Sequence, residues 1–399
     1  MNVQSLAGHS AAPPRKLRIA VFNRTFSPTG GGAERYSIAL VEQLSARHEM
    51  HVFAQEADHH WPGVTYHRVS TPMRKPRWVN QLWFATVTWW ATRRGFDVVH
   101  SHENTWHGEV QTVHVLPVKY NLFHARSGVR LVLRWIKVVT SPRLLAYLGL
   151  ERVRYATRPG RQVVVTSESL RPIMAQSYPG CAAAVSVITP GITMPDLPVS
   201  VAQKRAARIG LGLPMEGTCL LFVGNDYRKK GLEALLHALV KLPDDVVLAV
   251  VGNAAHVAEF RAMAVTLGVD GRVFFLGALK DVRPAYEAAN CLIHPTLEDT
   301  FAMVVLEAMA HGLPVVVSGP RYCGISGMLQ DGIDALILDA PRDANRLAEV
   351  LQVLLEQKSL QNTLSQGAAS FAMNYQWREI ALQQEAVYFS AITAKEKAA

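Results

Sequence analysis

The stretch that decides the fold is residues 297–316, which read LEDTFAMVVLEAMAHGLPVV. It follows a short apolar run at 291–295, passes through a loop with two acids and continues as an apolar helix at 303–310. Gly312 ends this helix, and a further apolar run begins at 315. Strand, loop, helix and strand in this order are typical of a parallel sheet covered by helices. The start of such a helix carries unpaired N–H groups and suits a phosphate.

The same alternation extends in both directions from this stretch. The expected strands of the second half are 220–224, 246–252, 273–276, 291–295, 315–318 and 335–338. Those of the first half are 17–22, 51–54, 98–100, 110–115, 163–166 and 185–188. We therefore predict an α/β fold with two doubly wound, Rossmann-like domains facing a cleft. Ligands of such sheets bind beyond the carboxyl ends of the strands, so the cleft is the expected binding site.

Local composition predicts the domain boundaries. Residues 1–14 are small and polar with Pro13-Pro14, as in a flexible tail. Proline and glycine are dense at 189–198, where the first series of strands stops. We predict a first domain at 15–192, a linker at 193–214 and a second domain at 215–373. The helical pattern at 374–399 carries Trp377, and we expect it to cross back to the first domain.

Composition excludes several protein classes. With 399 residues, 49% apolar and 18% charged, the chain is a folded globular protein rather than a disordered one. Its four cysteines are far apart and form no CxxC pair, which argues against a disulfide framework or a zinc knuckle. The chain contains neither a membrane-spanning apolar run nor a secretory signal at 1–16. We expect a cytoplasmic protein that is soluble or bound peripherally to a membrane.

Positive charge is concentrated in the first half of the chain. The residues before Val199 include 23 basic and 11 acidic side chains, a net charge of +12, whereas the remainder carries −3. Between 116 and 160 there are nine basic residues and one acid, interleaved with apolar residues at helical spacing. A cationic amphipathic surface of this kind binds anionic lipid. A core-facing helix with a solvated basic side is the alternative, and no nucleic-acid-binding motif is present.

The stretch at 297–316 resembles the signature of the family-4 retaining glycosyltransferases, which have the two-domain GT-B fold. The family pattern of an acid, seven residues and a Glu falls on Asp299 and Glu307. By this resemblance Glu307 holds the ribose hydroxyls of the nucleotide and Asp299 contacts the donor sugar. The other expected donor-site residues between these two acids are Thr300, Phe301, Ala302, Met303 and Val304.

Two residues depart from that pattern. The first acid is Asp299 where the family commonly has Glu, so the neighbouring Glu298 is an alternative for its role. Ala302 stands where the family usually has glycine, and its methyl group could crowd the backbone approach to the donor. A solvated acidic loop before a core helix is the alternative reading of the whole stretch.

A second motif follows the first strand of the second half. Arg228, Lys229 and Lys230 are three adjacent cations that would repel one another unless an anion such as a diphosphate joined them. The run resembles the donor-phosphate motif of the family, with Lys230 on the family lysine and Lys229 on the preceding basic residue. Asn225 replaces an arginine that the family often has, so Arg228 or Lys229 would supply that charge. A basic surface loop is the alternative.

A glycine-rich loop lies near the start of the chain. Residues 27–35 read SPTGGGAER and lead into a helical pattern at 33–46. The loop is a poor dinucleotide fingerprint, because the third glycine and the ribose-binding acid are missing. It is similar to a family loop that lies under the donor diphosphate, which predicts that Gly31 and Gly32 contact the donor. A plain tight turn is the alternative.

Histidines are dense at 99–114, in the sequence VHSHENTWHGEVQTVH. A metal site is conceivable, but strand-end histidines are more often structural. Relatives have a His or Asp near the anomeric carbon at the end of the strand here at 110–114. That resemblance selects His114 as a catalytic residue, with Glu109 second and a structural histidine as the alternative.

No Asp-x-Asp triad is present, so the usual carboxylate pair for a catalytic metal is missing. Lys230 and the helix dipole would then stabilise the leaving phosphate, and we expect neither a metal nor another cofactor. The resemblance, strongest from 222 to 339, implies a retaining transferase with a nucleotide-sugar donor, favoured as a UDP-sugar. The acceptor it favours is a glycolipid or oligosaccharide such as a lipopolysaccharide core at the inner membrane face. A nucleotide-sugar epimerase or hydrolase, and a non-catalytic nucleotide-sugar-binding membrane protein, are the alternatives.

Overall fold

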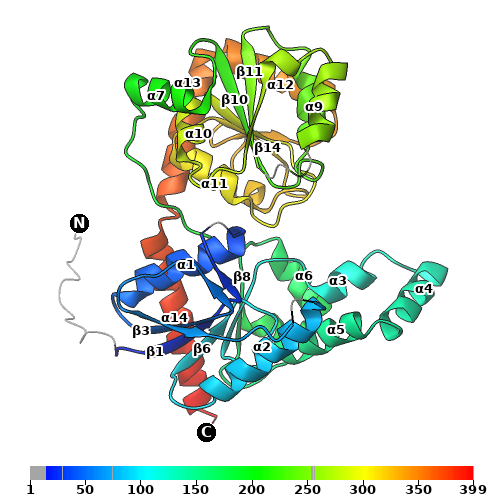
Figure 1. Cartoon of the computed structure of the whole chain (residues 1–399), viewed down its shortest axis with the longest axis vertical. Coiled ribbons are helices and arrows are strands. Elements are labelled where there is room, and N and C mark those ends of the chain that lie inside the picture. Colours follow the sequence, from blue (N-terminus) through cyan, green and yellow to red (C-terminus); the bar gives the residue numbers. More distant parts are fainter. Residues whose placement is uncertain (1–14, 29, 74, 253–254, 256, 399) are drawn as a thin grey trace, which may run out of the picture.

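Two parallel sheets, one in each domain, organise the computed structural model (Figure 1). The structure describes residues 15–28, 30–73, 75–252, 255 and 257–398. The predicted tail at 1–14 and Thr29 of the glycine-rich loop lie outside the described residues. Helices flank each sheet, and the two domains meet through the loops at the carboxyl ends of their strands. The GT-B arrangement predicted from the sequence is confirmed.

The first domain contains a seven-stranded sheet in the order β5-β3-β1-β6-β7-β8-β9, with every neighbouring pair parallel. Its central strands carry apolar residues on both faces, because helices cover the sheet from both sides. The strands are β1 (Arg18–Phe22), β3 (Glu49–Ala54), β5 (Val64–Arg68), β6 (Val98–Ser101), β7 (Val110–Val113), β8 (Gln162–Val165) and β9 (Val185–Val187). The helices are α1 (Gly32–Ser45), α2 (Arg77–Thr92), α3 (Val118–Phe123), α4 (Gly128–Val139), α5 (Pro142–Arg154) and α6 (Leu170–Ser177).

The second domain contains a six-stranded parallel sheet in the order β12-β11-β10-β13-β14-β15. All six residues of β11 are buried, as in a strand covered on both faces. The strands are β10 (Thr218–Val223), β11 (Val246–Val251), β12 (Val273–Gly277), β13 (Cys291–His294), β14 (Val315–Ser318) and β15 (Leu336–Leu338). The helices are α7 (Val201–Leu211), α8 (Leu232–Leu239), α9 (Val257–Thr266), α10 (Arg283–Ala288), α11 (Met303–Ala310), α12 (Ala344–Glu356) and α13 (Lys358–Met373).

The last helix, α14 (Trp377–Glu396), returns to the first domain, where it packs along α1 (Figure 1). Trp377, Ile380 and Tyr388 lie in the first domain's core. The crossing is tight at Gly191, because a Cβ there would approach the Trp377 ring to 2.7 Å. The predicted crossing of the C-terminal helix is therefore observed.

The structure differs from the sequence prediction in two places. The segment 193–214, predicted as a linker, contains α7, whose Lys204 and Arg208 donate hydrogen bonds to the carbonyls of Ala289 and Ala288. The helix therefore belongs to the second domain, and the connecting segment is shorter than predicted. The edge strand β5 and the small pair β2 (Thr25–Phe26) and β4 (Glu56–Ala57) were not predicted. In β5 no residue is fully buried, so it lacks the apolar run that marks the other strands.

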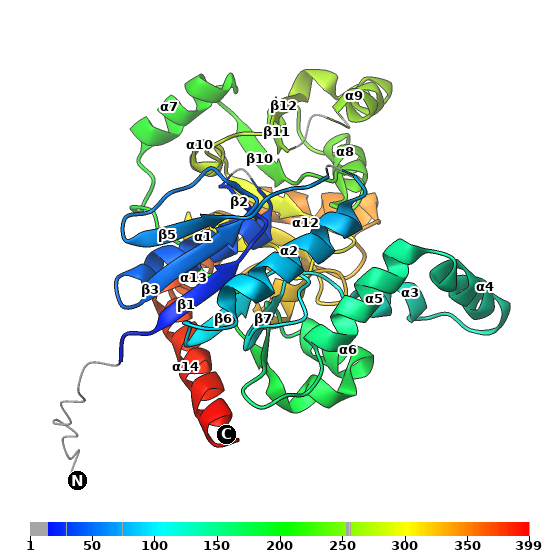
Figure 2. The ribbon, with the colours of Figure 1, turned by 60° about the horizontal axis from the view of Figure 1, so that its bottom comes forward.

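One group of helices projects from the body of the first domain. Figures 1 and 2 both show α3 and α4 extending away from the sheet, with α5 leading back to it. In α4 one residue, Val138, is buried. Its exposed apolar side chains are Val129, Val132, Leu133, Trp135, Ile136 and Val139. We call α3, α4 and α5 the projecting helices.

Candidate functional site

The predicted site residues of the two domains meet at their interface. The Thr300 hydroxyl, at the start of the loop before α11, donates to the backbone carbonyl of His114 over 3.3 Å. Arg35, in the first turns of α1, forms an ion pair of 3.0 Å with Glu307 in α11. The carboxyl end of β7, the start of α1 and the loop before α11 therefore form one site.

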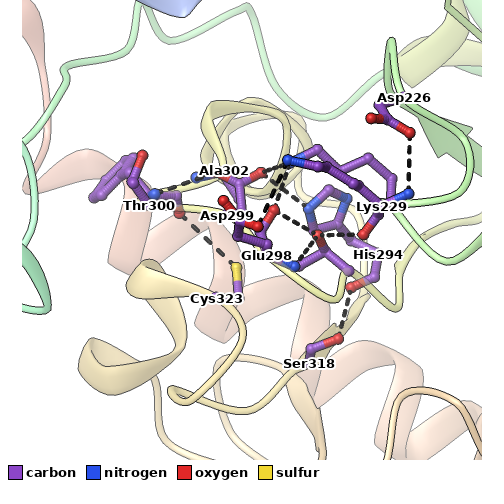
Figure 3. Close-up of polar contacts among 12 residues, drawn as sticks. Asp226, Lys229, His294, Glu298, Asp299, Thr300, Ala302, Ser318 and Cys323 are labelled. Atoms are coloured by element: carbon purple, nitrogen blue, oxygen red, sulfur yellow. Dashed lines mark hydrogen bonds and ion pairs between the residues drawn. The ribbon is translucent and has the colours of Figure 1, made fainter. Parts of the chain in front are cut away.

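Asp299 is the most highly connected residue of this site (Figure 3). Its Oδ1 accepts hydrogen bonds from the backbone N–H groups of Phe301 and Ala302, at 3.2 and 2.8 Å. Its Oδ2 lies 2.6 Å from Lys230 Nζ and 3.4 Å from His294 Nε2. Both carboxylate oxygens are thus held in place.

These contacts determine the charge of Asp299. Burial alone would raise its pKa, but the His294 imidazole at 3.4 Å and the charge of Lys230 outweigh burial and hold the pKa well below its usual range. His294 is fully buried, and burial lowers its pKa despite the neighbouring carboxylate. At neutral pH the cluster is an ion pair between Asp299 and Lys230, backed by a neutral histidine.

Glu298, the alternative for the role of Asp299, points elsewhere. Its side chain is 58% exposed, and its carboxylate lies 3.6 Å from the equally exposed Lys229 Nζ. Figure 3 shows the two adjacent acids with different partners. The structure therefore favours Asp299 as the acid of the site.

Ala302 occupies a backbone conformation that ordinarily needs glycine. Its φ is +70°, in the left-handed region, and it forms the N-cap of α11. This explains physically why a glycine would be preferred there. A non-glycine residue in this region is less stable by about 1–2 kcal/mol.

We expect Ala302→Gly to raise the free energy of unfolding by about 0.5–1 kcal/mol, because the relief of strain exceeds the added flexibility of the unfolded chain. Urea denaturation measures the change. Ala308→Gly in the second half of α11 is the matched control and should lose about 1 kcal/mol or more, since glycine is unfavourable inside a helix. Equal losses in both variants would contradict the strain assigned to Ala302.

The three adjacent cations do not converge. Each pairs with a different carboxylate: Arg228 with Glu259 of α9, Lys229 with Glu298 and Lys230 with Asp299. The side chains of Arg228 and Lys229 are 66% and 58% exposed, whereas that of Lys230 is 21% exposed. Lys230 alone of the three is built into the site. Gly231, with φ +79°, permits this turn, since a Cβ there would clash with the Pro295 carbonyl at 2.0 Å.

Glu307 is held from both domains. Its Oε1 pairs with Arg35, and its Oε2 accepts a hydrogen bond of 2.6 Å from the hydroxyl of Tyr286 in α10. Tyr286 is buried and stacks on His311 at a ring distance of 5.0 Å. Glu307 therefore presents a rigidly oriented carboxylate that is 13% exposed. Met303 and Val304 are partly buried in the first turn of the same helix.

The glycine-rich loop leads directly into α1. Gly31 is the N-cap of the helix with no side-chain cap, and a Cβ on Gly32 would meet no other atom within 4 Å. The backbone at Gly32 is therefore open to a ligand, whereas a Cβ on Gly31 would approach the Glu34 carboxylate to 3.1 Å.

His114 follows β7 and contacts a second histidine. Its Nε2 lies 2.9 Å from Nδ1 of His102, and the two rings are stacked at 5.2 Å. Burial, and then the charge of Arg154, lowers the pKa of His114 to about 3. The residue is therefore neutral at physiological pH.

The prediction for Glu109 was wrong in position. Glu109 precedes β7 and His114 follows it, so the two residues are five positions apart, a distance of roughly 16 Å at about 3.3 Å per residue. Its carboxylate accepts from the Val99 N–H at 2.9 Å and pairs with Lys395 of α14 at 2.7 Å. Glu109 joins the C-terminal helix to the sheet and does not belong to the site.

Sequence reasoning assigned no role to three further residues of this region. Arg35 and His294 stand within quoted motifs, next to residues with predicted roles, but their partners come from other elements. Tyr286 gives no sequence signal, because an aromatic residue in an apolar helix looks like core. Among the described residues no group of three or more His, Cys, Asp or Glu side chains is arranged to hold a metal ion. No helix in the described ranges is long and apolar enough to cross a bilayer.

Comparison with known proteins gives two family matches. Residues 30–194 match the model for "Glycosyltransferase Family 4", and residues 203–371 match that for "Glycosyl transferases group 1". The two matches divide the chain where the two domains meet. Together they cover both halves of the site described above.

Individual relatives agree with this result. The chain is 31% identical to a D-inositol 3-phosphate glycosyltransferase of Xylanimonas cellulosilytica, over 52% of this chain and 51% of that protein. It is 27% identical to the lipopolysaccharide glucosyltransferase WaaG of Escherichia coli, over 57% and 61% of the two chains. The chain thus spans about half to three fifths of the length of these curated relatives.

Solved structures share the fold. The crystal structure of WaaG superposes with a TM-score of 0.77 at 22% identity, covering 92% of this chain and 98% of that one. Anabaena Alr3699/HepE in complex with UDP and glucose superposes with a TM-score of 0.71 at 20% identity, over 92% and 98%. At these identities the likeness concerns the fold.

Proposed function

We propose that this chain, which belongs to the family-4 glycosyltransferases of GT-B fold, transfers a sugar from a nucleotide-sugar donor to an acceptor hydroxyl with retention of the anomeric configuration. The single observation that carries this proposal is the ion pair of Lys230 with Asp299 at 2.6 Å, directly beside the start of α11. A leaving diphosphate would need both a cation and a helix N-terminus, and the two lying side by side support the proposal.

The donor would bind mainly to the second domain. The carboxylate of Glu307 would accept hydrogen bonds from two ribose hydroxyls. The ribose would then replace Arg35 as the partner of Glu307. Lys230 would turn from Asp299 to the β-phosphate, leaving the Asp299 carboxylate to accept from hydroxyls of the sugar. Gly31, Gly32 and the backbone N–H groups at the start of α1 would face the diphosphate from the other side.

The reaction needs a leaving group that departs easily and an acceptor held on the same face. Positive charge from Lys230 and the dipole of α11 would stabilise the nucleoside diphosphate as its bond to the sugar breaks. The departing phosphate would take the proton of the attacking hydroxyl, which gives retention without a covalent enzyme intermediate. Lys230 and the helix would do the work that a metal ion does in other glycosyltransferases, so we propose a metal-independent reaction. A UDP-sugar is the donor that we favour.

The acceptor that we propose is an anionic glycolipid, such as a lipopolysaccharide core, at the cytoplasmic membrane surface. Support comes from the projecting helices, where the apolar side chains of α4 are exposed beside Arg130, Arg134 and Lys137. Trp135 is 50% exposed on this helix, and such residues insert at the lipid headgroups. Similarity to WaaG, a lipopolysaccharide glucosyltransferase, points to the same kind of acceptor.

We expect the wild-type protein to bind phosphatidylglycerol vesicles, with binding that falls steeply between 0.05 and 0.5 M salt, as surface charges are screened within about 10 Å at 0.1 M. Replacing Arg126, Arg130 and Arg134 together by Gln should weaken binding by about two orders of magnitude, at roughly 1 kcal/mol per charge. Co-sedimentation measures both.

Apolar contacts are tested separately. Val132→Ser with Ile136→Ser on α4 should also weaken vesicle binding, because both side chains are more than half exposed. Val265→Ser on α9, whose side chain is 62% exposed in the other domain, is the matched control and should bind like wild type. Unchanged binding by the arginine and α4 variants would show that the projecting helices do not contact lipid.

Two alternatives predict other results. An epimerase or hydrolase acting on the nucleotide sugar would consume donor at the same rate with and without acceptor. A non-catalytic binding protein would bind nucleotide and turn nothing over. Nucleotide release from UDP-, GDP- and ADP-sugars, with and without bacterial lipid extract, separates these functions and identifies the base.

A further inference from the structure

Two stacked histidines at the ends of β6 and β7 form a hydrogen-bonded pair. His102 Nδ1 lies 2.9 Å from His114 Nε2, and the ring planes differ by 19°. Tyr36 of α1 packs edge-on against His114, at a ring distance of 5.1 Å, and at a tilt against His102, at 5.8 Å. The pair is therefore fixed in one geometry.

A third histidine, His100, packs against His102. The His100 ring lies 4.3 Å from that of His102, and both of its nitrogens have partners: the Tyr388 hydroxyl and the Thr112 hydroxyl, each at 2.7 Å. His100 therefore has no nitrogen left to bond to His102. The nearby formal charge is that of Arg154, whose guanidinium bonds to Gln111 and the Thr112 carbonyl.

All three histidines are neutral in this environment. Burial is the main reason that the pKa of His100 and of His114 falls to about 3 and that of His102 falls well below its usual range, and Arg154 adds to the effect. A neutral imidazole has one N–H and one lone pair. Between His102 and His114, one ring must therefore donate and the other accept.

The direction of that hydrogen bond follows from the other nitrogen of His102. His102 Nε2 is buried and has no hydrogen-bond partner among the described residues. If Nδ1 of His102 accepted, the proton would sit on Nε2 as an orphaned buried N–H, which proteins avoid more strictly than an unused acceptor. The proton of His102 therefore belongs on Nδ1, donated to His114.

We propose that His102 is a positioning residue that fixes the tautomer of His114, so that His114 carries its proton on Nδ1 and offers a substrate a hydrogen-bond donor rather than a base. With Nε2 occupied by His102, Nδ1 is the nitrogen of His114 that is available to a ligand; it forms no hydrogen bond within the described part of the chain. The substrate oxygen that accepts this bond would be a hydroxyl or ring oxygen of the donor sugar. This assignment rests on the proposed function for its substrate, whereas the tautomer is a property of the ligand-free protein.

The tautomer is measured by ¹⁵N NMR of the ligand-free protein with labelled histidine, in which the pattern of couplings to the ring protons identifies the protonated nitrogen. His114→Ala assigns the signal of His114 among the 15 histidines. We expect the Nδ1–H form of His114 at pH 7, unchanged from pH 5 to 8. An Nε2–H form, or a charged ring in that range, would overturn the proposal.

Two variants of His102 test whether it sets the tautomer of His114. His102→Asp puts a carboxylate oxygen, which can only accept, near the position of Nδ1, so His114 should change to the Nε2–H form, and kcat for nucleotide release should fall about tenfold with an unchanged KM for the donor. His102→Asn offers an amide N–H near the same position and should keep the Nδ1–H form and most of kcat. A His114 whose Nε2 stays unprotonated in His102→Asp would contradict the role of His102. If His102→Asp does not fold, the wild-type tautomer and the His102→Asn variant still test the proposal.

The result is independent of the proposed function. A protein that turns over no nucleotide sugar but shows the Nδ1–H form would refute the transferase and leave the tautomer assignment standing. Turnover of a nucleotide sugar with His114 in the Nε2–H form would support the transferase and refute the tautomer assignment.

Discussion

Lys230→Ala is expected to lower kcat by about two to three orders of magnitude while weakening the binding of nucleoside diphosphate by less than about tenfold. The ammonium group of Lys230 lies 2.6 Å from Asp299 and beside the start of α11, where the leaving phosphate would gain negative charge. A charge that matters most as the bond breaks stabilises the transition state more than the bound substrate. One well-placed donor of this kind contributes roughly 3–4 kcal/mol. Donor saturation curves together with nucleotide titration calorimetry separate kcat from binding.

The neighbouring lysine provides the control. Lys229 has the same charge, but its side chain is 58% exposed and its partner Glu298 lies 3.6 Å away. Lys229→Ala should therefore change kcat by no more than a few-fold. Circular dichroism of Lys230→Ala checks that the unpaired Asp299 has not unfolded the domain. Near-normal activity of Lys230→Ala, combined with a loss of wild-type activity in EDTA that Mg²⁺ restores, would contradict the metal-independent mechanism.

Asp299→Asn is expected to reduce kcat by about a hundredfold or more, because the amide keeps the shape of the side chain but removes the charge opposite Lys230. The amide oxygen of Asn can still accept from the N–H groups of Phe301 and Ala302, so the loop should keep its conformation. Glu298→Gln is the matched control, since it makes the same chemical change on a 58% exposed side chain. Steady-state kinetics of the two variants provide the comparison. A large loss in Glu298→Gln with none in Asp299→Asn would show that Glu298, rather than Asp299, is the acid of the site.

The same variant also has a pH signature. The folded protein holds the pKa of Asp299 below its unfolded value of about 3.9, so the ionised carboxylate stabilises the fold at any pH above that value. The stabilisation is lost as pH falls below about 4 toward the folded pKa. The difference in free energy of unfolding between wild type and Asp299→Asn should therefore be full at pH 7 and shrink in stronger acid. A difference that stayed constant down to pH 2 would show that folding does not lower the pKa of Asp299.

Much of the fold could be predicted because parallel strands buried on both faces leave long apolar runs. The runs at 246–252 and 315–318 correspond to β11 and β14, and the helix predicted at 303–310 is α11. The edge strand β5 could not be predicted because none of its residues is fully buried and polar residues alternate with its Val64 and Tyr66, so it has no continuous apolar run. The helix α7 lies between proline-rich segments, which hid its packing against α10.

The sequence predicted which kinds of side chain form the site, but not which way each side chain points. Asp299 and Glu298 are adjacent acids, and only the turn of the loop decides which one faces Lys230. Glu109 and His114 are both next to β7 in sequence, but they lie at opposite ends of this four-residue strand. The departure at Ala302 was visible in the sequence, while its physical cost, a left-handed φ, needed the backbone.

The partners of charged side chains were hidden for a related reason. A run such as Arg228, Lys229 and Lys230 suggests one shared anion. Instead, Arg228 pairs with Glu259 of α9, and the two lysines pair with two different acids of the loop before α11. The interdomain pair of Arg35 and Glu307 joins residues that are 272 positions apart. Contacts of this kind depend on how the elements pack, which local sequence does not determine.

The most direct test of the central claim measures release of nucleoside diphosphate from a nucleotide sugar in excess EDTA, with and without anionic glycolipid acceptor, by wild type and Lys230→Ala. Metal-independent sugar transfer through Lys230 predicts release that acceptor stimulates, that EDTA leaves intact and that the variant lacks. No acceptor-stimulated release from UDP-, GDP- or ADP-sugars, or release that requires added metal and survives in Lys230→Ala, would contradict it.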